Sequence, residues 1–231
     1  MVRNDSRSLI IAPSILAADR GYFFDEAKRA AESGADWLHV DIMDGHFVPN
    51  ISFGVDFVPT FRKAVGGLIL DVHLMIEQPD RYARSFIEAG ADILTVHLEA
   101  SHEVEKTITI IHDMGCKVGL AINPLTELQH ALPLLHRIDL LLCMTVNPGF
   151  GGQPFIIEVL EKVRLARAYC DQHNLEVDIQ VDGGVNMITA GPSVTAGANV
   201  LVAGTALFKE KDMAAAVMEM RSKATEVSSA G

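Results

Sequence analysis

Residues 22–43 read YFFDEAKRAAES-GAD-WLHVDIM and contain the unit from which the fold is built. An amphipathic segment, Tyr22–Ser33, leads through Gly34-Ala35-Asp36 into an apolar run, Trp37–Met43. Glycine after a helix adopts the left-handed conformation at low cost, so this segment predicts a helix, a turn and a strand. The same arrangement recurs, with Gly-Ala-Asp at Gly90–Asp92 and Gly-Ala-Asn at Gly197–Asn199.

Short apolar runs alternate with turns and amphipathic stretches along the whole chain. We expect strands at Leu9–Ile15, Trp37–Met43, Leu68–Ile76, Ile93–Leu98, Lys117–Asn123, Leu140–Val146, Val177–Val181 and Val200–Ala203. We expect helices at Tyr22–Ser33 with Asp19 as its cap, Asp80–Ala89, Glu103–Met114, Pro154–His173 and Asp212–Thr225. Eight parallel strands joined by right-handed crossovers predict an α/β fold, the (β/α)₈ TIM barrel. A doubly wound open sheet is the alternative.

Length and composition limit the domain organisation and the partners. No linker divides the 231 residues, so we expect a single domain over residues 1–231, with about residues 1–8 as a polar N-terminal extension. The formal net charge of −11 argues against nucleic acid or a membrane as partner. It still allows a phosphorylated ligand, because backbone N–H groups bind phosphate.

The cysteines and the apolar runs bear on location. Three widely spaced cysteines without a CxxC motif are typical of a reduced, cytoplasmic protein. The first eight residues lack the apolar run of a signal peptide. The longest apolar run, Ile138–Val146, is too short to cross a bilayer.

Polar residues gather at the expected carboxyl ends of three strands. The alternation of side chains along a strand places His39 and Asp41 on one face, and the parity of the next strand selects His73. Another strand ends at Asp182. Two imidazoles and two carboxylates suit Zn²⁺, Fe²⁺, Mn²⁺ or Co²⁺, and active sites of TIM barrels lie at this edge. Alternatively each histidine is a hydrogen-bonded core residue, although two buried carboxylates without a cation are costly.

Three further polar residues lie at strand ends: His97, Glu99 and Asn123. The sequence leaves open whether they belong to the site or to the core.

Glycine-rich turns follow the last three expected strands. They read Asn147-Pro148-Gly149-Phe150-Gly151-Gly152-Gln153, Gly183-Gly184 and Gly204-Thr205. Loops at these positions of a TIM barrel often bind phosphate, while ordinary turns are the alternative for each cluster. Near the strand ends lie Met43, Met75 and Met144, which are either gap-filling core residues or a layer that excludes water from the site.

Four segments resemble the ribulose-phosphate 3-epimerase family. They are His39–Asn50 (HVDIMDGHFVPN), Asp71–Met75 (DVHLM), Met144–Gln153 (MTVNPGFGGQ) and Val181–Val185 (VDGGV). The resemblance extends from about Ala12 to Phe208. It implies a TIM-barrel isomerase of the pentose phosphate pathway that is metal-dependent, cytoplasmic and homo-oligomeric.

The resemblance also implies a role for individual residues. The implied ligands of one divalent transition metal are His39, Asp41, His73 and Asp182, and Asp41 and Asp182 are the implied catalytic acid–base pair. The implied substrate contacts are Ser14, His73, Gly149, Phe150, Gly151, Gly152, Asp182, Gly183, Gly184, Gly204 and Thr205. Residues implied to shield the intermediate are Met43, Met75 and Met144. Thr205 stands where the family pattern has serine, so the hydroxyl is kept but the added methyl is expected to shift the loop.

The implied reaction interconverts D-ribulose 5-phosphate and D-xylulose 5-phosphate by inversion at C3. The C3 hydrogen is acidic because C2 is a carbonyl, and a metal on the C2 and C3 oxygens would stabilise the enediolate. Two carboxylates on opposite faces, one ionised and one protonated, invert C3 without any turning of the intermediate. A cation also makes a carboxylate a weaker base, so it must lower the pKa of the substrate by more than that of the base.

Three other functions stay open from the sequence. The first is an epimerase of a hexulose phosphate such as allulose 6-phosphate, whose motifs are similar. The second is a phosphate-binding barrel lyase or decarboxylase, which would typically carry Asp-x-Lys-x-x-Asp where this chain has Asp71-Val72-His73. The third is a non-catalytic sugar-phosphate binding protein, which would not need carboxylates on two faces.

Overall fold

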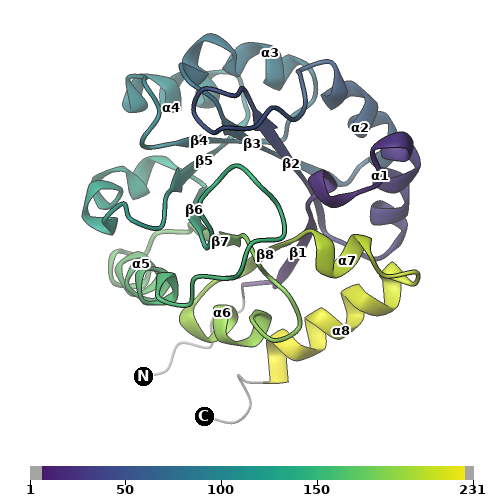
Figure 1. The fold of residues 1–231 in the computed structure, drawn as a ribbon. Coiled ribbons are helices and arrows are strands. Elements are labelled where there is room, and N and C mark those ends of the chain that lie inside the picture. Colours follow the sequence, from purple (N-terminus) through teal and green to yellow (C-terminus); the bar gives the residue numbers. More distant parts are fainter. Residues whose placement is uncertain (1–6, 227–231) are drawn as a thin grey trace.

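Eight parallel strands form one sheet whose two ends meet, in a computed structural model that describes residues 7–226. The strands are β1 (Ile10–Pro13), β2 (Trp37–Met43), β3 (Ile69–Met75), β4 (Ile93–His97), β5 (Lys117–Ile122), β6 (Leu140–Met144), β7 (Asp178–Asp182) and β8 (Val200–Ala203). Their order is β1-β8-β7-β6-β5-β4-β3-β2. A parallel bridge between Ser14 and His39 joins β1 to β2 and closes the barrel (Figure 1). The predicted (β/α)₈ TIM barrel is confirmed, while the part of the expected polar extension at residues 1–6 lies outside the described residues.

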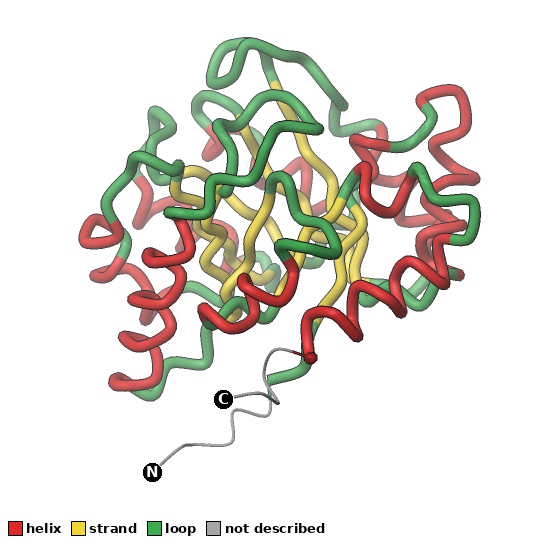
Figure 2. The backbone as a smooth tube through the Cα atoms, turned by 60° about the horizontal axis from the view of Figure 1, so that its bottom comes forward, coloured by secondary structure: helices red, strands yellow, loops and turns green. Residues whose placement is uncertain are grey.

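Helices surround the strands on the outside (Figure 1). They are α1 (Phe23–Glu32), α2 (Phe57–Val65), α3 (Ala83–Glu88), α4 (Val104–Asp113), α5 (Val159–His173), α6 (Ala190–Ala196), α7 (Thr205–Phe208) and α8 (Met213–Glu226). Between β5 and β6 the connection is made by two short 3₁₀ helices, Leu128–His130 and Leu132–Arg137. Figure 2 shows the helices outside the strands and long loops gathered above one end of the barrel. Among residues 7–226 no helix has the length and apolar character needed to cross a membrane.

Several element boundaries differ from those expected. The helix expected to start at Pro154 begins at Val159, because the preceding segment folds back and Ile156 N–H donates to the Thr145 carbonyl at 2.8 Å. Asp19 accepts the Gly21 N–H at 2.9 Å and caps a 3₁₀ turn rather than α1. Helices α2 and α6 were not predicted; both contain a proline, which obscures a helical pattern.

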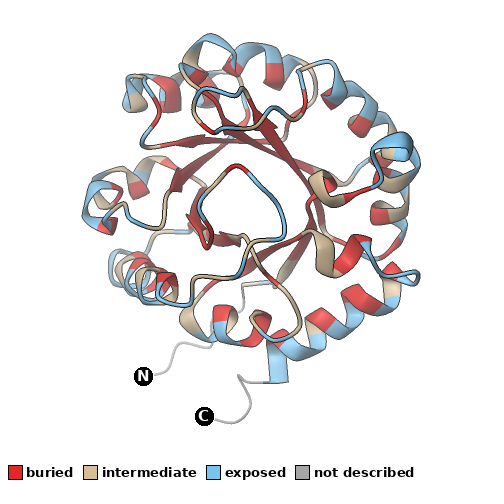
Figure 3. Ribbon diagram, in the orientation of Figure 1, coloured by how far each residue is buried: buried red, intermediate tan, exposed pale blue. Residues whose placement is uncertain are grey.

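Apolar side chains fill the barrel and the space between barrel and helices. Figure 3 shows the strands as almost entirely buried. A separate cluster lies inside the barrel, with Trp37, Ile93, Leu140 and Leu142 among its members. Dense packing of this kind leaves the carboxyl ends of the strands as the place where polar groups can reach a ligand.

The polar residue that precedes every second strand joins the strands in pairs at their amino ends, and in three of the four cases it belongs to a Gly-Ala-Asp or Gly-Ala-Asn segment. A side-chain oxygen just before every second strand accepts a backbone N–H of the preceding strand: Asp36 from Ile11 (2.7 Å), Asp92 from Leu70 (2.7 Å), Asp139 from Val118 (2.8 Å) and Asn199 from Ile179 (2.9 Å). The backbone N–H of the same four residues donates back to the carbonyl of the same partner. The pairs β1/β2, β3/β4, β5/β6 and β7/β8 are thus closed in the same way.

In three of these four strand pairs, a different arginine side chain adds hydrogen bonds to the same polar residue. Arg62 contacts the Asp92 carboxylate and donates to the Gly90 carbonyl at 3.0 Å. Equivalent contacts join Arg221 to Asp36 and Gly34, and Arg167 to Asn199 and Gly197. Asp36, Asp92 and Asn199 therefore each receive a backbone and a charged donor, and hydrogen bonds that involve a charged group are stronger than neutral ones.

Replacing Asp92 with alanine should destabilise the protein by about 1–3 kcal/mol, because the Leu70 N–H loses its side-chain acceptor and the Arg62 guanidinium loses the carboxylate among its acceptors. Urea unfolding followed by circular dichroism measures the change. Asp113→Ala is the control: Asp113 is exposed at the end of α4, and its loss should cost no more than about 0.5 kcal/mol. Equal effects of the two substitutions would show that the contacts of Asp92 with Leu70 and Arg62 do not stabilise the barrel.

Candidate functional site

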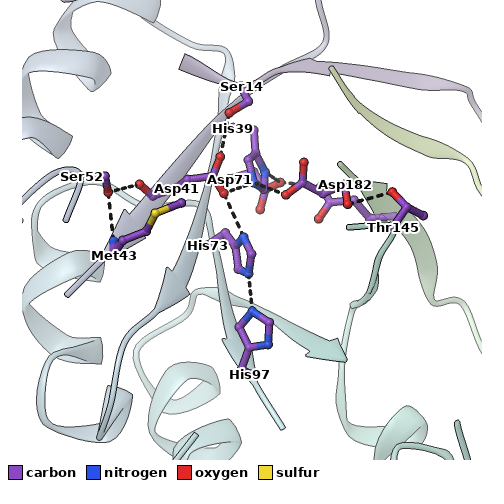
Figure 4. Close-up of polar contacts among 11 residues, drawn as sticks. Ser14, His39, Asp41, Met43, Ser52, Asp71, His73, His97, Thr145 and Asp182 are labelled. Atoms are coloured by element: carbon purple, nitrogen blue, oxygen red, sulfur yellow. Dashed lines mark hydrogen bonds and ion pairs between the residues drawn. The ribbon is translucent and has the colours of Figure 1, made fainter. Parts of the chain in front are cut away.

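Four side chains from three strands converge at the carboxyl end of the barrel (Figure 4). Strand β2 supplies His39 and Asp41, β3 supplies His73 and β7 supplies Asp182. Asp41 Oδ1 lies 3.1 Å from His39 Nε2 and 3.0 Å from His73 Nδ1. His39 Nε2 lies 3.9 Å from Asp182 Oδ2. One ligand atom from each of the four residues lies within 4.8 Å of the others.

The chemistry of this donor set fits a divalent transition metal ion. Two imidazole nitrogens and two carboxylate oxygens form the mixed set that such ions accept. His39 and His73 are fully buried, Asp41 is 3% exposed and the Asp182 side chain is 14% exposed. Two carboxylates held this close and this dry are costly unless a cation offsets their charge.

Other buried side chains hold the ligand atoms in place. Asp71 Oδ2 lies 2.7 Å from His39 Nδ1, which leaves His39 Nε2 directed into the cluster. Gln180 donates to the same Asp71 oxygen at 2.6 Å from the opposite part of the barrel. Ser14 Oγ donates to Asp41 Oδ2 at 2.7 Å. A carboxylate that orients an imidazole in this way is common where histidine binds metal.

The two carboxyl groups have opposite electrostatic environments. Burial alone would raise the pKa of Asp41, but the charge and hydrogen bonds of His39 and His73 outweigh it and hold this pKa well below its usual range. Burial, followed by the negative charge of Asp41, raises the pKa of Asp182 to about 7. In the absence of a cation, one carboxyl is therefore ionised near neutral pH while the other readily carries a proton.

The two histidines also differ. Burial would lower the pKa of His39, but Asp41 and Asp71 together raise it well above its ordinary value. Burial lowers the pKa of His73 to about 4, although its hydrogen bond to Asp41 opposes the shift. His73 is thus neutral at physiological pH and has one nitrogen lone pair available for a metal ion.

A cavity of about 650 Å³ opens above the cluster. It is lined by most residues that the sequence predicted: Ser14, Asp41, Met43, Met75, Met144, Gly149, Phe150, Gly151, Gly152, Asp182, Gly183, Gly184, Gly204 and Thr205. His39 and His73 lie beneath its floor and are fully buried. The expected contact between His73 and substrate therefore stays a prediction. Met43, Met75 and Met144 are nearly fully buried side chains of the cavity wall.

Two of the glycine-rich loops, those after β6 and β7, meet at this cavity. Gly183 and Gly184 have φ values of +114° and +70°, and a Cβ at Gly184 would lie 2.7 Å from the Phe155 nitrogen. Only glycine allows the loops after β6 and β7 to approach this closely. Asn50 Nδ2 donates to the Gly149 carbonyl at 2.7 Å, which connects the loop after β2 to the loop after β6. Figure 1 shows the loop after β6 lying over the barrel mouth.

Two groups of contributing residues were missed from the sequence. Asp71 and Gln180 are one group, although strand parity with His73 and Asp182 could have indicated them. The other group is a pair of cations, Arg20 and Lys209, which line the cavity and whose side chains form no ion pair or hydrogen bond with any described residue. No local pattern in the sequence distinguishes this pair from other surface cations.

The fold and the site together define a class of protein, the TIM-barrel enzymes with acid–base groups at the carboxyl ends of the strands. A sequence model of the ribulose-phosphate 3-epimerase family matches residues 10–208. The chain belongs to this family.

Individual known proteins show the same relationship. The ribulose-phosphate 3-epimerase of Bacillus subtilis (strain 168) is 48% identical over 212 residues, covering 91% of this chain and 97% of that protein. The ribulose-phosphate 3-epimerase of Escherichia coli (strain K12) is 40% identical over 222 residues, covering 96% of this chain and 99% of that protein. The crystal structure of 3-keto-L-gulonate-6-phosphate decarboxylase from Vibrio cholerae superimposes with a TM-score of 0.70 at 17% identity, covering 96% of this chain and 99% of that one, and shares the fold.

Proposed function

We propose that this chain is a ribulose-phosphate 3-epimerase, an isomerase that interconverts D-ribulose 5-phosphate and D-xylulose 5-phosphate. One observation carries the proposal: Asp41 and Asp182 approach the same point from strands β2 and β7 and have opposite protonation tendencies (Figure 4). Family membership and the names of the relatives support the choice of reaction. A sugar-phosphate binding protein without catalysis would not need this pair.

Each carboxyl group has a defined task in the inversion. A carboxylate on one face removes the C3 proton, and a carboxylic acid on the other face returns a proton to C3. For the reverse reaction the two groups exchange roles. Ser14 Oγ donates to Asp41 Oδ2 at 2.7 Å and holds the carboxylate in a fixed orientation, so the group does not need to rotate between the two directions.

His39, Asp41, His73 and Asp182 are the residues that would hold a divalent transition metal ion. The ion would supply Lewis-acid polarisation of the ketose and would offset the charge of the two carboxylates. Which of Zn²⁺, Fe²⁺, Mn²⁺ and Co²⁺ binds is not distinguished by this donor set. Met43, Met75 and Met144 form an apolar part of the wall that keeps water from the reacting carbon.

The phosphate group of the substrate is assigned to the glycine-rich side of the cavity. Gly149, Phe150, Gly151 and Gly152 line the cavity, as do Gly183, Gly184, Gly204 and Thr205. Backbone N–H groups there would bind the phosphate oxygens. Arg20 and Lys209 line the same cavity and would attract a dianion toward an otherwise acidic protein.

The preference for a pentose phosphate over a hexulose phosphate is part of the proposal, as are a cytoplasmic location and a homo-oligomeric state. Comparing kcat/KM on ribulose 5-phosphate and allulose 6-phosphate measures the preference directly. Size-exclusion chromatography with light scattering measures the oligomeric state.

In D₂O the purified protein should incorporate deuterium at C3 of ribulose 5-phosphate and form xylulose 5-phosphate, because proton removal and return exchange with solvent. Proton NMR follows both signals. Prolonged chelation should abolish them, and Zn²⁺, Co²⁺, Mn²⁺ or Fe²⁺ should restore them. Exchange that persists in protein shown by elemental analysis to be metal-free would refute the role of the metal, and a lack of exchange in metal-loaded protein would refute the proposed reaction.

Replacing both Arg20 and Lys209 with glutamine should lower kcat/KM roughly 3- to 10-fold at low ionic strength and leave kcat nearly unchanged, because the two cations act on the approach of the phosphate. The difference should vanish at about 1 M salt, where the Debye length is about 3 Å. Steady-state kinetics over a salt series measures both effects.

The control for this double variant is Lys106→Gln, which removes an exposed cation of α4 that does not line the cavity. It should leave kcat/KM unchanged. A double variant with the salt dependence of the wild type would contradict the assigned role of Arg20 and Lys209.

A further inference from the structure

A line of side chains leads from the candidate metal site to His97 at the end of β4 (Figure 4) and continues to Glu99 in the loop that follows. His73 Nδ1 lies 3.0 Å from Asp41 Oδ1, and His73 Nε2 lies 2.8 Å from His97 Nε2. His97 Nδ1 in turn lies 3.1 Å from Glu99 Oε2. His73 and His97 are fully buried, so neither has water as an alternative partner.

Glu99 is the outer end, and it is an ionised acceptor. Its Oε1 accepts the Asn123 N–H at 2.7 Å and is also bonded by the Thr126 hydroxyl. Burial alone would raise the pKa of Glu99, but these hydrogen bonds and the bond to His97 hold that pKa at about 2. A carboxylate has no proton to donate, so the contact with His97 requires a proton on His97 Nδ1.

The direction of the next contact follows. His73 Nδ1 is the ring nitrogen that faces Asp41 and the candidate metal site, so a bound cation would take its lone pair and leave the proton of His73 on Nε2. The 2.8 Å contact then has His73 Nε2 donating to His97 Nε2. His97 carries its own proton on Nδ1, where the Glu99 carboxylate accepts it.

We propose that Glu99 and His97 are positioning residues that fix the tautomer of His73 and thereby make its Nδ1 the metal-binding atom. This inference deepens the proposed function, because it depends on the metal site proposed there. His39 is fixed in the opposite sense: Asp71 contacts Nδ1 and leaves Nε2 for the ion. The two histidines thus present different ring nitrogens to the same point, each selected by a different carboxylate.

Glu99→Gln tests the inference with almost no change of shape. The glutamine oxygen would stay with the Asn123 N–H, and its amide would donate to His97 Nδ1. Both imidazoles would then reverse, and His73 would carry its proton on Nδ1, where it bonds Asp41 and blocks a metal ion. Competition with a fluorescent chelator should show Zn²⁺ binding about 10- to 100-fold weaker than in the wild type.

Glu77→Gln is the matched control. The carboxylate of Glu77 also accepts a backbone N–H from the next loop, that of Ser101 at 3.1 Å, but it contacts no histidine. Its Zn²⁺ affinity should equal that of the wild type. If Glu99→Gln binds Zn²⁺ as tightly as Glu77→Gln does, the inference is overturned.

Long-range ¹⁵N–¹H NMR correlations of the imidazoles give a readout that a purely structural role of Glu99 would not change. In the Zn²⁺-loaded wild type, His73 should be protonated at Nε2 and His97 at Nδ1, whereas His97 of metal-depleted Glu99→Gln should be protonated at Nε2. Protonation of His97 at Nε2 in the Zn²⁺-loaded wild type would overturn the inference. These measurements use no substrate. A wild type that binds no Zn²⁺ would contradict the proposed metal site. If the wild type binds Zn²⁺ and Glu99→Gln binds it equally well, only the proposed effect of Glu99 on the His73 tautomer is contradicted.

Discussion

Two buried carboxyl groups directed at one point are the constraint on which the rest of this structure depends. Asp41 and Asp182 cannot both stay ionised in a dry pocket without compensation. The protein resolves this conflict by surrounding Asp41 with two histidines and a serine, and by giving Asp182 a pKa near 7. The same arrangement provides the mixed donor set for a cation. An acid–base pair and a candidate metal site are therefore two consequences of one cluster.

The barrel supplies the rigidity that this cluster needs. Each ligand is on a strand, and the strands are closed in pairs at the opposite end by Asp36, Asp92, Asp139 and Asn199. At the ligand end, carboxylates of successive loops accept backbone N–H groups of the next loop, as Asp44 does from Glu77 and Glu77 does from Ser101. Hydrogen bonds at both ends of the strands fix the positions of the reacting groups before substrate binds. Substrate binding therefore does not have to order these groups.

The sequence predicted the fold and the chemical groups, because both follow from local patterns. The helix–turn–strand unit repeats visibly, and strand parity alone directs His39 and Asp41 to one face. Contacts between distant strands were beyond such patterns: Gln180 reaches Asp71 across the barrel, and His97 and Glu99 could not be told from core residues. The cavity cations Arg20 and Lys209 come together only because β8 closes against β1. Periodicity specifies which face a residue occupies, whereas the partner on that face depends on how the sheet closes.

The central claim is that Asp41 and Asp182 serve opposite faces of one carbon atom. Hydrogen–deuterium exchange at C3, measured separately on ribulose 5-phosphate and xylulose 5-phosphate with metal-loaded Asp41→Asn and Asp182→Asn, tests it directly. The account predicts that neither variant completes the inversion, and that each retains exchange with only one of the two sugars, a different sugar for each variant. Exchange of the same sugar by both variants, or of both sugars by either one, would contradict the assignment of one carboxyl group to each face.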